Sequence, residues 1–249
     1  EPTVFGRILL DRGALLIDGF SELRREIKLA QGLDIGDLRL VSGPFPAAIS
    51  VERAIGRMAA QHPNVTVDSA VVDWILATED VLAGKRDIAI VELLAAESSP
   101  DLETELIRSS PIRVFCRNGH PLSKRASVTV EDALSYPTVG STYTLRTIHS
   151  IPALRPHAVI DDKGRLQPQL KVDTIDAVKT VVAASNAIAG IFPPLIEREI
   201  QEGVFQLLPI DVSDFRLNYG FIWRKGRTIS PSMRAFMSYV REIESSFGD

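Results

Sequence analysis

Cysteine is almost absent from this 249-residue chain, which contains one thiol, at Cys116. A single cysteine cannot form an internal disulfide framework, so the composition favours a reducing compartment over an exported, disulfide-stabilised domain. Cys116 ends the apolar segment 112–116. We therefore expect it to be a buried strand thiol and not a reactive one.

Long hydrophobic runs are also missing. No segment approaches the ~18 consecutive apolar residues that a membrane-spanning helix requires. The first residues, EPTVFGR, lack the apolar core of a secretory signal. These absences predict a cytoplasmic protein without membrane contact, and the abrupt start indicates a chain cut from a longer one.

The chain has no excess of positive charge. Its formal net charge is −4, and Lys and Arg are interleaved with Asp and Glu. Neutralising the phosphates of a nucleic acid requires a clustered basic surface. This chain by itself is therefore expected to bind duplex DNA only weakly and without sequence preference.

The motifs of common catalytic sites do not occur. There is no Gly-x-Ser-x-Gly, no glycine-rich phosphate loop and no His-Glu-x-x-His. The histidines lack metal-ligand spacing; they are His62, His120, His149 and His157. The carboxylate pairs Asp161–Asp162 and Asp173/Asp176 lie beside turns or helix starts, where capping or solvation explains them better than acid–base catalysis. We therefore expect that the protein is not an enzyme and that it binds neither a cofactor nor a metal ion.

The N-terminal segment carries a heptad pattern. Residues 4–10 are typical of a short strand or hairpin arm, and residues 14–31 of an amphipathic helix. Alternating spacings of four and three separate its apolar positions, which are Leu16, Phe20, Leu23, Ile27 and Ala30. This apolar stripe packs either on its own domain or against the same helix of a second chain, and we favour the second arrangement.

Strand and helix patterns then alternate twice. In the first series, strands are predicted at 38–41, 65–71 and 87–91, helices at 48–58 and 77–82, and a turn at 43–46. In the second series, strands are predicted at 112–116, 138–140, 170–172, 187–191, 205–208 and 219–223, with helices at 130–134, 175–184, 194–201 and 231–245. The fully apolar strand 87–91 predicts a parallel sheet with βαβ crossovers in the first series, and the two series together predict two α/β lobes.

Five short motifs carry a resemblance to a known family. They are Leu10-Asp11-Arg12-Gly13, residues 82–91 (LAGKRDIAIV), His120-Pro121-Leu122, residues 190–194 (GIFPP) and residues 221–225 (FIWRK). In this order and spacing, they resemble the LysR-type transcriptional regulators over essentially the whole chain. Asp11 stands where that family usually has threonine, a change that preserves the capping chemistry.

The resemblance implies a two-lobed, type-2 periplasmic-binding-protein-like fold preceded by a long dimerisation linker helix. Residues 1–36 would be the end of the winged helix-turn-helix and the linker helix. Lobe I would span 38–112 and 220–249, and lobe II 113–219. The helices that enter DNA would precede residue 1, so the full-length regulator would bind DNA as a homodimer or homotetramer, while this chain senses a small effector.

Ligands of such folds sit beyond the carboxyl ends of the strands. The resulting candidate effector-binding residues are Ser42, Phe45, Trp74 and Ile75 in lobe I, with Ser141, Thr142, Tyr143, Thr144, Arg146, Phe192 and Pro193 in lobe II. Pro44 and Pro46 remove amide donors that the family usually offers to a carboxylate. The pattern predicts an apolar or aromatic effector with at most one anionic end, although core packing is the alternative for Phe45, Trp74 and Phe192.

Two other functions stay open at this stage. The same fold serves solute-binding proteins of transport systems, but the heptad helix and the missing signal disfavour that function. An enzyme on the same fold would need an acid or base between the lobes, which the sequence does not single out.

The linker helix provides the first test. Burial contributes about 1.5–3 kcal/mol for each of four residues, Leu16, Phe20, Leu23 and Ile27. This gain only offsets the association cost of about 4–15 kcal/mol, so a stable dimer also requires contacts between the lobes. We expect a dimer that Leu23→Asp weakens in sedimentation experiments. A monomer at micromolar concentration that the substitution leaves unchanged would contradict the pairing.

Overall fold

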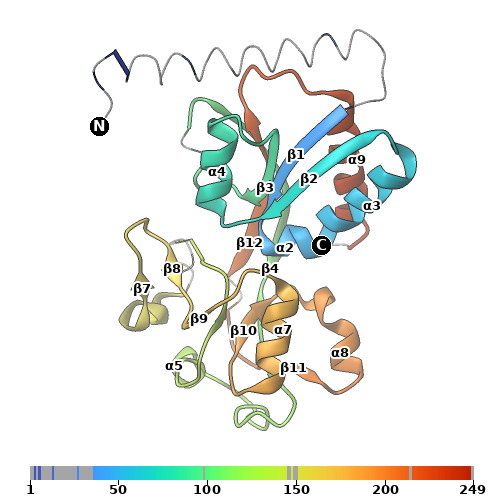
Figure 1. Cartoon of the computed structure of the whole chain (residues 1–249). Helices are drawn as coiled ribbons and strands as arrows, with labels where there is room; N and C mark the ends of the chain where they lie inside the picture. The colour runs from blue at the N-terminus through green and yellow to red at the C-terminus, as the bar shows by residue number, and fades with distance from the viewer. Residues whose placement is uncertain are drawn as a thin grey trace.

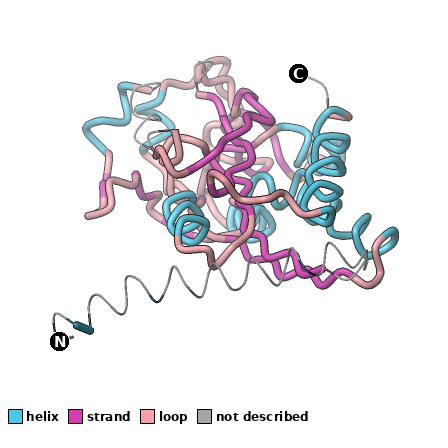
Figure 2. Tube along the Cα trace, turned by 90° about the horizontal axis from the view of Figure 1, so that it is seen from above, coloured by secondary structure: helices cyan, strands magenta, loops and turns pink. Residues whose placement is uncertain are grey.

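The computed structural model describes residues 3, 5–6, 13, 27, 36–97, 99–144, 147, 151–212 and 215–247. Within them Figure 1 shows two groups of elements, one above the other, joined by long strands. Strands run through the middle and helices lie to either side in the view from above (Figure 2). No helix of the described part combines the length and the apolarity needed to cross a bilayer.

Lobe I, the upper group, is built on a five-stranded sheet of order β2-β1-β3-β12-β4. Its strands are β1 (Gly36–Ser42), β2 (Val65–Val71), β3 (Ile88–Glu92), β4 (Leu102–Pro111) and β12 (Arg216–Arg224). Strand β1 pairs in parallel with β2 and β3, whereas β12 runs antiparallel to β3 and β4. The parallel part matches the crossovers that the sequence predicts.

Side-chain alternation along the central strands places helices on both faces of this sheet. Ile88 and Ile90 of β3 belong to one core cluster, with helices α3 (Glu52–Gln61) and α9 (Pro231–Ser245). Ala89 and Val91 belong to a second cluster, with helix α4 (Trp74–Leu82). Because successive strand residues point to opposite faces, the fully apolar β3 is buried on both sides.

The segment after β1 differs from the sequence-based expectation. The turn predicted at 43–46 is wrong, because helix α2 (Pro44–Pro46) begins at its first proline and continues through the π-helix η1 (Ala47–Val51) into α3. The first amides of a helix have no intrahelical acceptor, so prolines there lose no hydrogen bond. Two prolines in this position therefore start a helix.

Lobe II is built on a smaller, antiparallel sheet of order β10-β5-β11. Its strands are β5 (Arg113–Arg117), β10 (Ala189–Ile191) and β11 (Phe205–Leu207). Around it lie the pairs β6 (Val139–Gly140) with β9 (Leu170–Lys171) and β7 (Val159–Ile160) with β8 (Leu166–Gln167). Its helices are α5 (Val130–Leu134), η2 (Pro152–His157), α7 (Ile175–Ala184), η3 (Pro193–Leu195) and α8 (Glu197–Gln201). The residue boundaries predicted for the two lobes stay a prediction.

Most of the N-terminal segment lies outside the described residues, including Leu16, Phe20 and Leu23. Phe5 and Gly6 are helical, so the strand predicted at 4–10 is wrong at these two positions. Gly13 and Ile27 are also helical, and Ile27 is 49% exposed. The pairing of this segment between two chains remains a prediction.

A buried ion pair joins the crossing strand β4 to the C-terminal helix. Arg108 and Glu244 are both buried, and Nε of Arg108 lies 2.6 Å from Oε2 of Glu244. The hydroxyl of Tyr219 on β12 donates to the other carboxylate oxygen at 2.7 Å. Burial and the neighbouring Glu244 carboxylate both raise the pKa of Tyr219, so the tyrosine stays neutral. Three elements thus meet at one charge pair.

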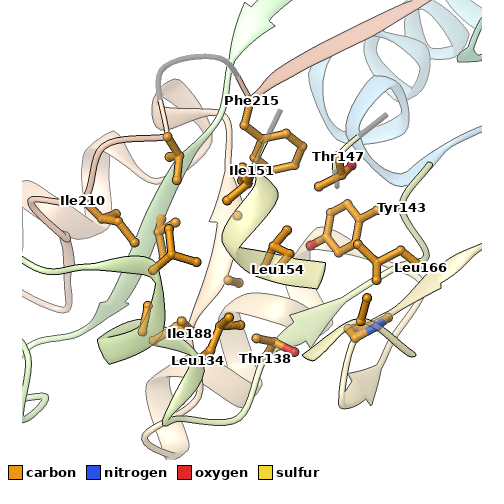
Figure 3. Close-up of a pocket in the computed structure, with 18 of the residues that line it drawn as sticks. Leu134, Thr138, Tyr143, Thr147, Ile151, Leu154, Leu166, Ile188, Ile210 and Phe215 are labelled. Atoms are coloured by element: carbon orange, nitrogen blue, oxygen red, sulfur yellow. The ribbon is translucent and has the colours of Figure 1, made fainter. Parts of the chain in front are cut away.

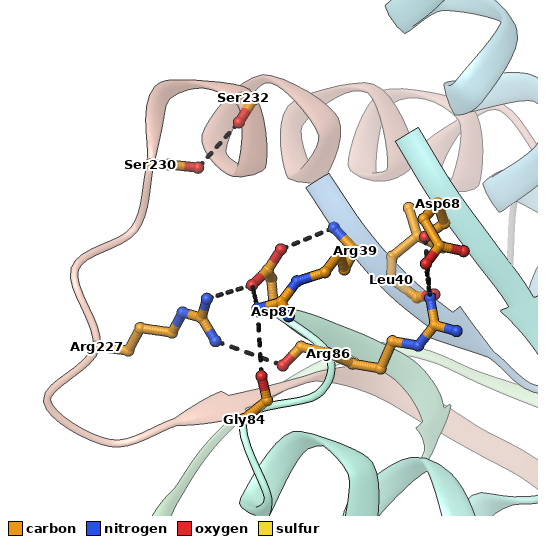
Figure 4. A network of polar contacts seen from close by, with 9 residues as sticks. All are labelled: Arg39, Leu40, Asp68, Gly84, Arg86, Asp87, Arg227, Ser230 and Ser232. Atoms are coloured by element: carbon orange, nitrogen blue, oxygen red, sulfur yellow. Dashed lines mark hydrogen bonds and ion pairs between the residues drawn. The ribbon is translucent and has the colours of Figure 1, made fainter. Parts of the chain in front are cut away.

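A second polar network holds the start of lobe I together (Figure 4). The carboxylate of Asp87 accepts hydrogen bonds from the Arg39 amide at 2.7 Å and from the Arg39 guanidinium at 3.0 Å. Arg227 contacts the same carboxylate and donates to the Arg86 carbonyl at 3.4 Å. Asp87 thereby connects β1, the start of β3 and the loop that leads to α9.

His120 is buried in the turn after β5. Its Nδ1 accepts a hydrogen bond from the Leu122 amide at 3.1 Å, and its Nε2 lies 3.1 Å from the Asn186 carbonyl. A neutral ring with the proton on Nε2 satisfies both contacts, whereas a second proton would break the first. Burial lowers the pKa of His120, and Arg117 contributes to the shift.

We therefore expect the stability of the protein to fall as the pH drops below about 6.5, where the unfolded histidine takes up a proton and the folded one does not. The contribution is fully present above that pH. Chemical denaturation of wild type and His120→Gln at about pH 8 and about pH 5.5 measures it. Between the two pH values, the wild type should lose more free energy of unfolding than His120→Gln. The extra loss should be smaller than about 1.4 kcal/mol per pH unit, the limit for a histidine that never takes up a proton in the folded state. Equal losses would contradict the assignment.

Candidate functional site

The candidate site lies where the two lobes face each other. Strands β1 and β2 of lobe I end at Ser42 and Val71, and β6 and β10 of lobe II end at Gly140 and Ile191. Strand ends of this kind carry ligand-binding groups in α/β proteins. The described residues contain no cluster of His, Cys, Asp or Glu side chains arranged to hold a metal ion.

Three of the expected residues carry buried polar atoms that have no hydrogen-bond partner among the described residues. These atoms are Oγ of Ser42, Nε1 of Trp74 and Oγ1 of Thr142. Ser42 is fully buried at the end of β1, Trp74 opens helix α4, and Thr142 is 6% exposed just after β6. Native proteins pair nearly all such atoms, because an unpaired one costs about 1–3 kcal/mol. The three unpaired atoms make these residues candidates for contact with a ligand.

The remaining lobe I candidates have different environments. Phe45 lies on α2 and packs within the main core cluster, so its ring contributes to the core. Ile75 is half-buried in the first turn of α4. Both were expected in loops, but α4 begins at Trp74 because Asp73 caps it, with Oδ1 accepting from the Ile75 and Leu76 amides at 3.0 Å.

Phe192 at the end of β10 is also packed rather than open. The guanidinium of Arg108 lies 5.1 Å from the centre of its ring, and the ring of Phe247 lies 6.2 Å away. Phe192 is 6% exposed. It therefore connects lobe II to the buried ion pair of lobe I. Pro193, half-buried, starts the short helix η3.

The loop 141–144 divides into two faces. Ser141 is half-buried, and Thr144 is buried, with its carbonyl accepting from the Thr147 amide at 3.1 Å. Tyr143 turns away into lobe II, where burial raises the pKa of its hydroxyl to about 12. Arg146, the cation expected beside these hydroxyls, lies outside the described residues.

Tyr143 lines a cavity that sequence reasoning missed (Figure 3). The cavity measures about 140 Å³ and lies within lobe II, between the β5–β10 face and the segments α5, η2 and β8. Mostly apolar side chains line it, including Leu134, Ile151, Leu154, Ile188, Ile210 and Phe215. These residues come from segments far apart in the sequence, and no local pattern marks them as one group.

A cross-lobe ion pair was also missed. Arg165, at the end of the β7–β8 loop, contacts Oδ2 of Asp73, the carboxylate that caps α4. Its Nε also lies 2.6 Å from Oδ2 of Asp161. Burial alone would raise the pKa of Asp161, but the amide and guanidinium of Arg165 outweigh it and hold that pKa below its usual range. A second contact, between Lys163 and Glu79 at 3.7 Å, joins the same two elements.

The sequence contains a pattern that predicts the β7–β8 loop, but nothing in it predicts that this loop contacts Asp73. Five residues, DDKGR, separate the two-residue strands β7 and β8, and Gly164 adopts a positive φ of 74°. A short glycine-containing loop between apolar segments is typical of a hairpin. That this hairpin reaches Asp73 across the lobes is visible only in the structure.

Comparisons with known proteins agree on one family. The LysR substrate binding domain family matches residues 31–244. The SDS degradation transcriptional activation protein of a Pseudomonas species is 31% identical over 248 residues, which cover 98% of this chain and 78% of that protein. A probable RuBisCO transcriptional regulator of a Synechocystis species is 27% identical over 250 residues, which cover 99% of this chain and 71% of that protein.

Solved structures agree on the fold. The regulatory domain of MetR, a LysR family regulator from N. meningitidis, is 17% identical, with a TM-score of 0.63 over 85% of this chain and 94% of that one. The effector binding domain of QuiR, in complex with shikimate, is 18% identical, with a TM-score of 0.60 over 85% of this chain and 98% of that one. These likenesses confirm the α/β fold of the type-2 periplasmic-binding-protein kind.

The cross-lobe pair is tested by a double-mutant cycle. Asp73→Asn keeps the cap of α4, because asparagine caps helices well, and removes the charge that Arg165 contacts. Arg165→Gln removes the partner. We expect a coupling of about 1–2 kcal/mol in the free energy of unfolding, since both side chains are largely buried.

The exposed pair Arg198–Glu202 on lobe II is the matched control, and its cycle should be additive. An additive result for Asp73 and Arg165 would show that the contact does not hold the lobes together.

Proposed function

Because the chain belongs to the LysR substrate binding domain family, and is thus the effector-sensing part of a LysR-type transcriptional regulator, we propose that it binds a small, largely apolar effector between its lobes. The effector would carry one acceptor-rich or singly anionic end. The observation that carries this proposal is the set of three buried polar atoms without partners, on Ser42, Trp74 and Thr142.

The chemistry of these atoms defines the end of the effector that meets them. The Trp74 indole can only donate, and the two hydroxyls can both donate and accept. Each of the three can therefore donate to a carboxylate, a sulfate ester or a carbonyl group. Arg165, which contacts Asp73 directly before Trp74, is already paired with Asp73 and Asp161. A second buried negative charge on the effector is therefore disfavoured, because an unpaired buried charge costs several kcal/mol.

The body of the effector would meet apolar surface. Ile75 and the ring of Trp74 stand at the start of α4, half-buried. The name of the relative at 31% identity refers to SDS degradation, and SDS has one anionic end on an apolar chain. The structures of two similar domains, those of CcmR and QuiR, contain 2-PG and shikimate.

The full-length protein, we infer, acts in the cytoplasm as a homodimer or homotetramer without enzyme activity. LysR family regulators bind small-molecule effectors and DNA and are usually oligomeric, and the curated relatives are transcriptional regulators. They give no support to a solute-binding protein or an enzyme. Effector binding would change the lobe arrangement and reposition DNA-binding heads, with a coupling of about 1–3 kcal/mol.

A ligand screen with one substituted hydroxyl tests the proposal. Aromatic acids, alkyl sulfates and short dicarboxylates are compared by thermal shift, and hits are titrated calorimetrically. In Thr142→Val, which keeps the shape of the side chain, affinity for a hit should fall roughly 10- to 100-fold. Without ligand the same variant should be as stable as wild type or more stable, because the lost hydroxyl has no partner.

Thr180→Val, at an exposed position on α7, is the control and should leave the affinity for every hit unchanged. Two results would sink the proposal: stabilisation by dicarboxylates alone, or unchanged affinity of every hit for Thr142→Val.

A further inference from the structure

We propose that the apolar cavity inside lobe II is a second ligand site, separate from the inter-lobe site, and that it takes one aromatic ring or a short alkyl chain. The cavity lies within a single lobe, between strands β5 and β10 on one side and α5, η2 and β8 on the other (Figure 3). The inter-lobe site, in contrast, uses residues of both lobes.

The size of the cavity defines its occupant. Its volume is about 140 Å³, and an engineered cavity of roughly 150 Å³ lined by aliphatic and aromatic residues stays dry and binds benzene. The space therefore suits six or seven carbon atoms.

The lining is apolar where an occupant would lie. Of its polar members, Thr138 accepts a hydrogen bond from the Gln169 amide at 3.1 Å, and Gln167 donates to Asp161 at 2.7 Å. Tyr143 directs its hydroxyl inward (Figure 3). Because burial raises the pKa of this hydroxyl to about 12, it stays protonated and can donate.

Small residues create the space. Ala133, Ala158 and Ala189 line the cavity, Gly140 lies against the Tyr143 ring, and Gly190 faces Ile112 and Phe215. A Cβ on Gly140 would lie 2.6 Å from the Tyr143 hydroxyl, so a larger residue there would displace the ring. Protein cores are normally close-packed, and an empty apolar space destabilises them. A cavity kept open by small residues is consistent with an occupant that fills it.

The position of the cavity connects it to the sensing machinery. Tyr143 follows Thr142 of the inter-lobe site directly, and its ring lies 6.0 Å from that of Phe215. The carbonyl of Phe215 accepts a hydrogen bond from the Ile112 amide at 2.9 Å, where the two crossing strands leave lobe II. An occupant would thus support both the effector loop and the strands that carry the lobe movement.

The experiment uses toluene and 1-hexanol as probes and methyl NMR as the readout. Saturable shifts are expected at Ile151, Leu154 and Ile188, with none at Ile49 and Ile88 in the lobe I core. Ala133→Leu fills the cavity and should weaken toluene binding about tenfold or more. Ala158→Leu, at a half-buried position, repeats the test should the first variant fold poorly.

Two controls separate this site from the other one. Ala183→Leu, at an exposed position of α7, should bind toluene like wild type. Thr142→Val should also keep toluene binding, and Ala133→Leu should keep the affinity for an acid bound between the lobes. Equal toluene binding by both filling variants and wild type, shifts at Ile49 or Ile88, or no saturable shifts at all would overturn the proposal.

Discussion

The buried pair of Arg108 and Glu244 is the contact on which the arrangement of the two lobes depends. Removing two charges from water is costly, and mutual attraction offsets the cost only when further hydrogen bonds satisfy both groups. Ser110 and the Glu244 carbonyl accept from the guanidinium, at 3.1 Å and 2.5 Å, and Tyr219 donates to the carboxylate. The same guanidinium lies against Phe192 of lobe II. One cation therefore fixes the end of α9, a crossing strand and the opposite lobe.

The sequence predicts best those elements whose bounds depend on local residues, such as an apolar stripe and a capping residue. Helices α7 and α9 have the predicted bounds, because each combines an apolar stripe with a capping residue, Thr174 or Ser230. Strand β4 was missed, since it is an edge strand whose Glu, Thr, Arg and Ser residues interrupt any apolar pattern. Its existence depends on β12, more than a hundred residues later, and on the bulge at Gly220, where a Cβ would lie 1.9 Å from the Glu105 carbonyl oxygen.

The candidate site divides in the same way. The rule that ligands meet strand ends led to Ser42, Trp74 and Thr142, whose polar atoms are buried without partners. It does not distinguish an aromatic ring that faces a ligand from one that fills the core, so Phe45 and Phe192 were grouped with them. The lobe II cavity and the Asp73–Arg165 pair depend on residues that only the folded chain brings together; the pair is 92 positions apart.

The two oxygens of Asp73 have different tasks, and this division has a mechanical consequence. Oδ1 holds the first turn of α4 by contacts within three residues, while Oδ2 meets Arg165 from the other lobe. Separation of the lobes would break only the second contact, so the helix would move as a rigid body without fraying. Because both side chains of this pair are largely buried, dissolved ions screen the contact only weakly. Salt in the surroundings should therefore leave both this lobe contact and the first turn of α4 intact.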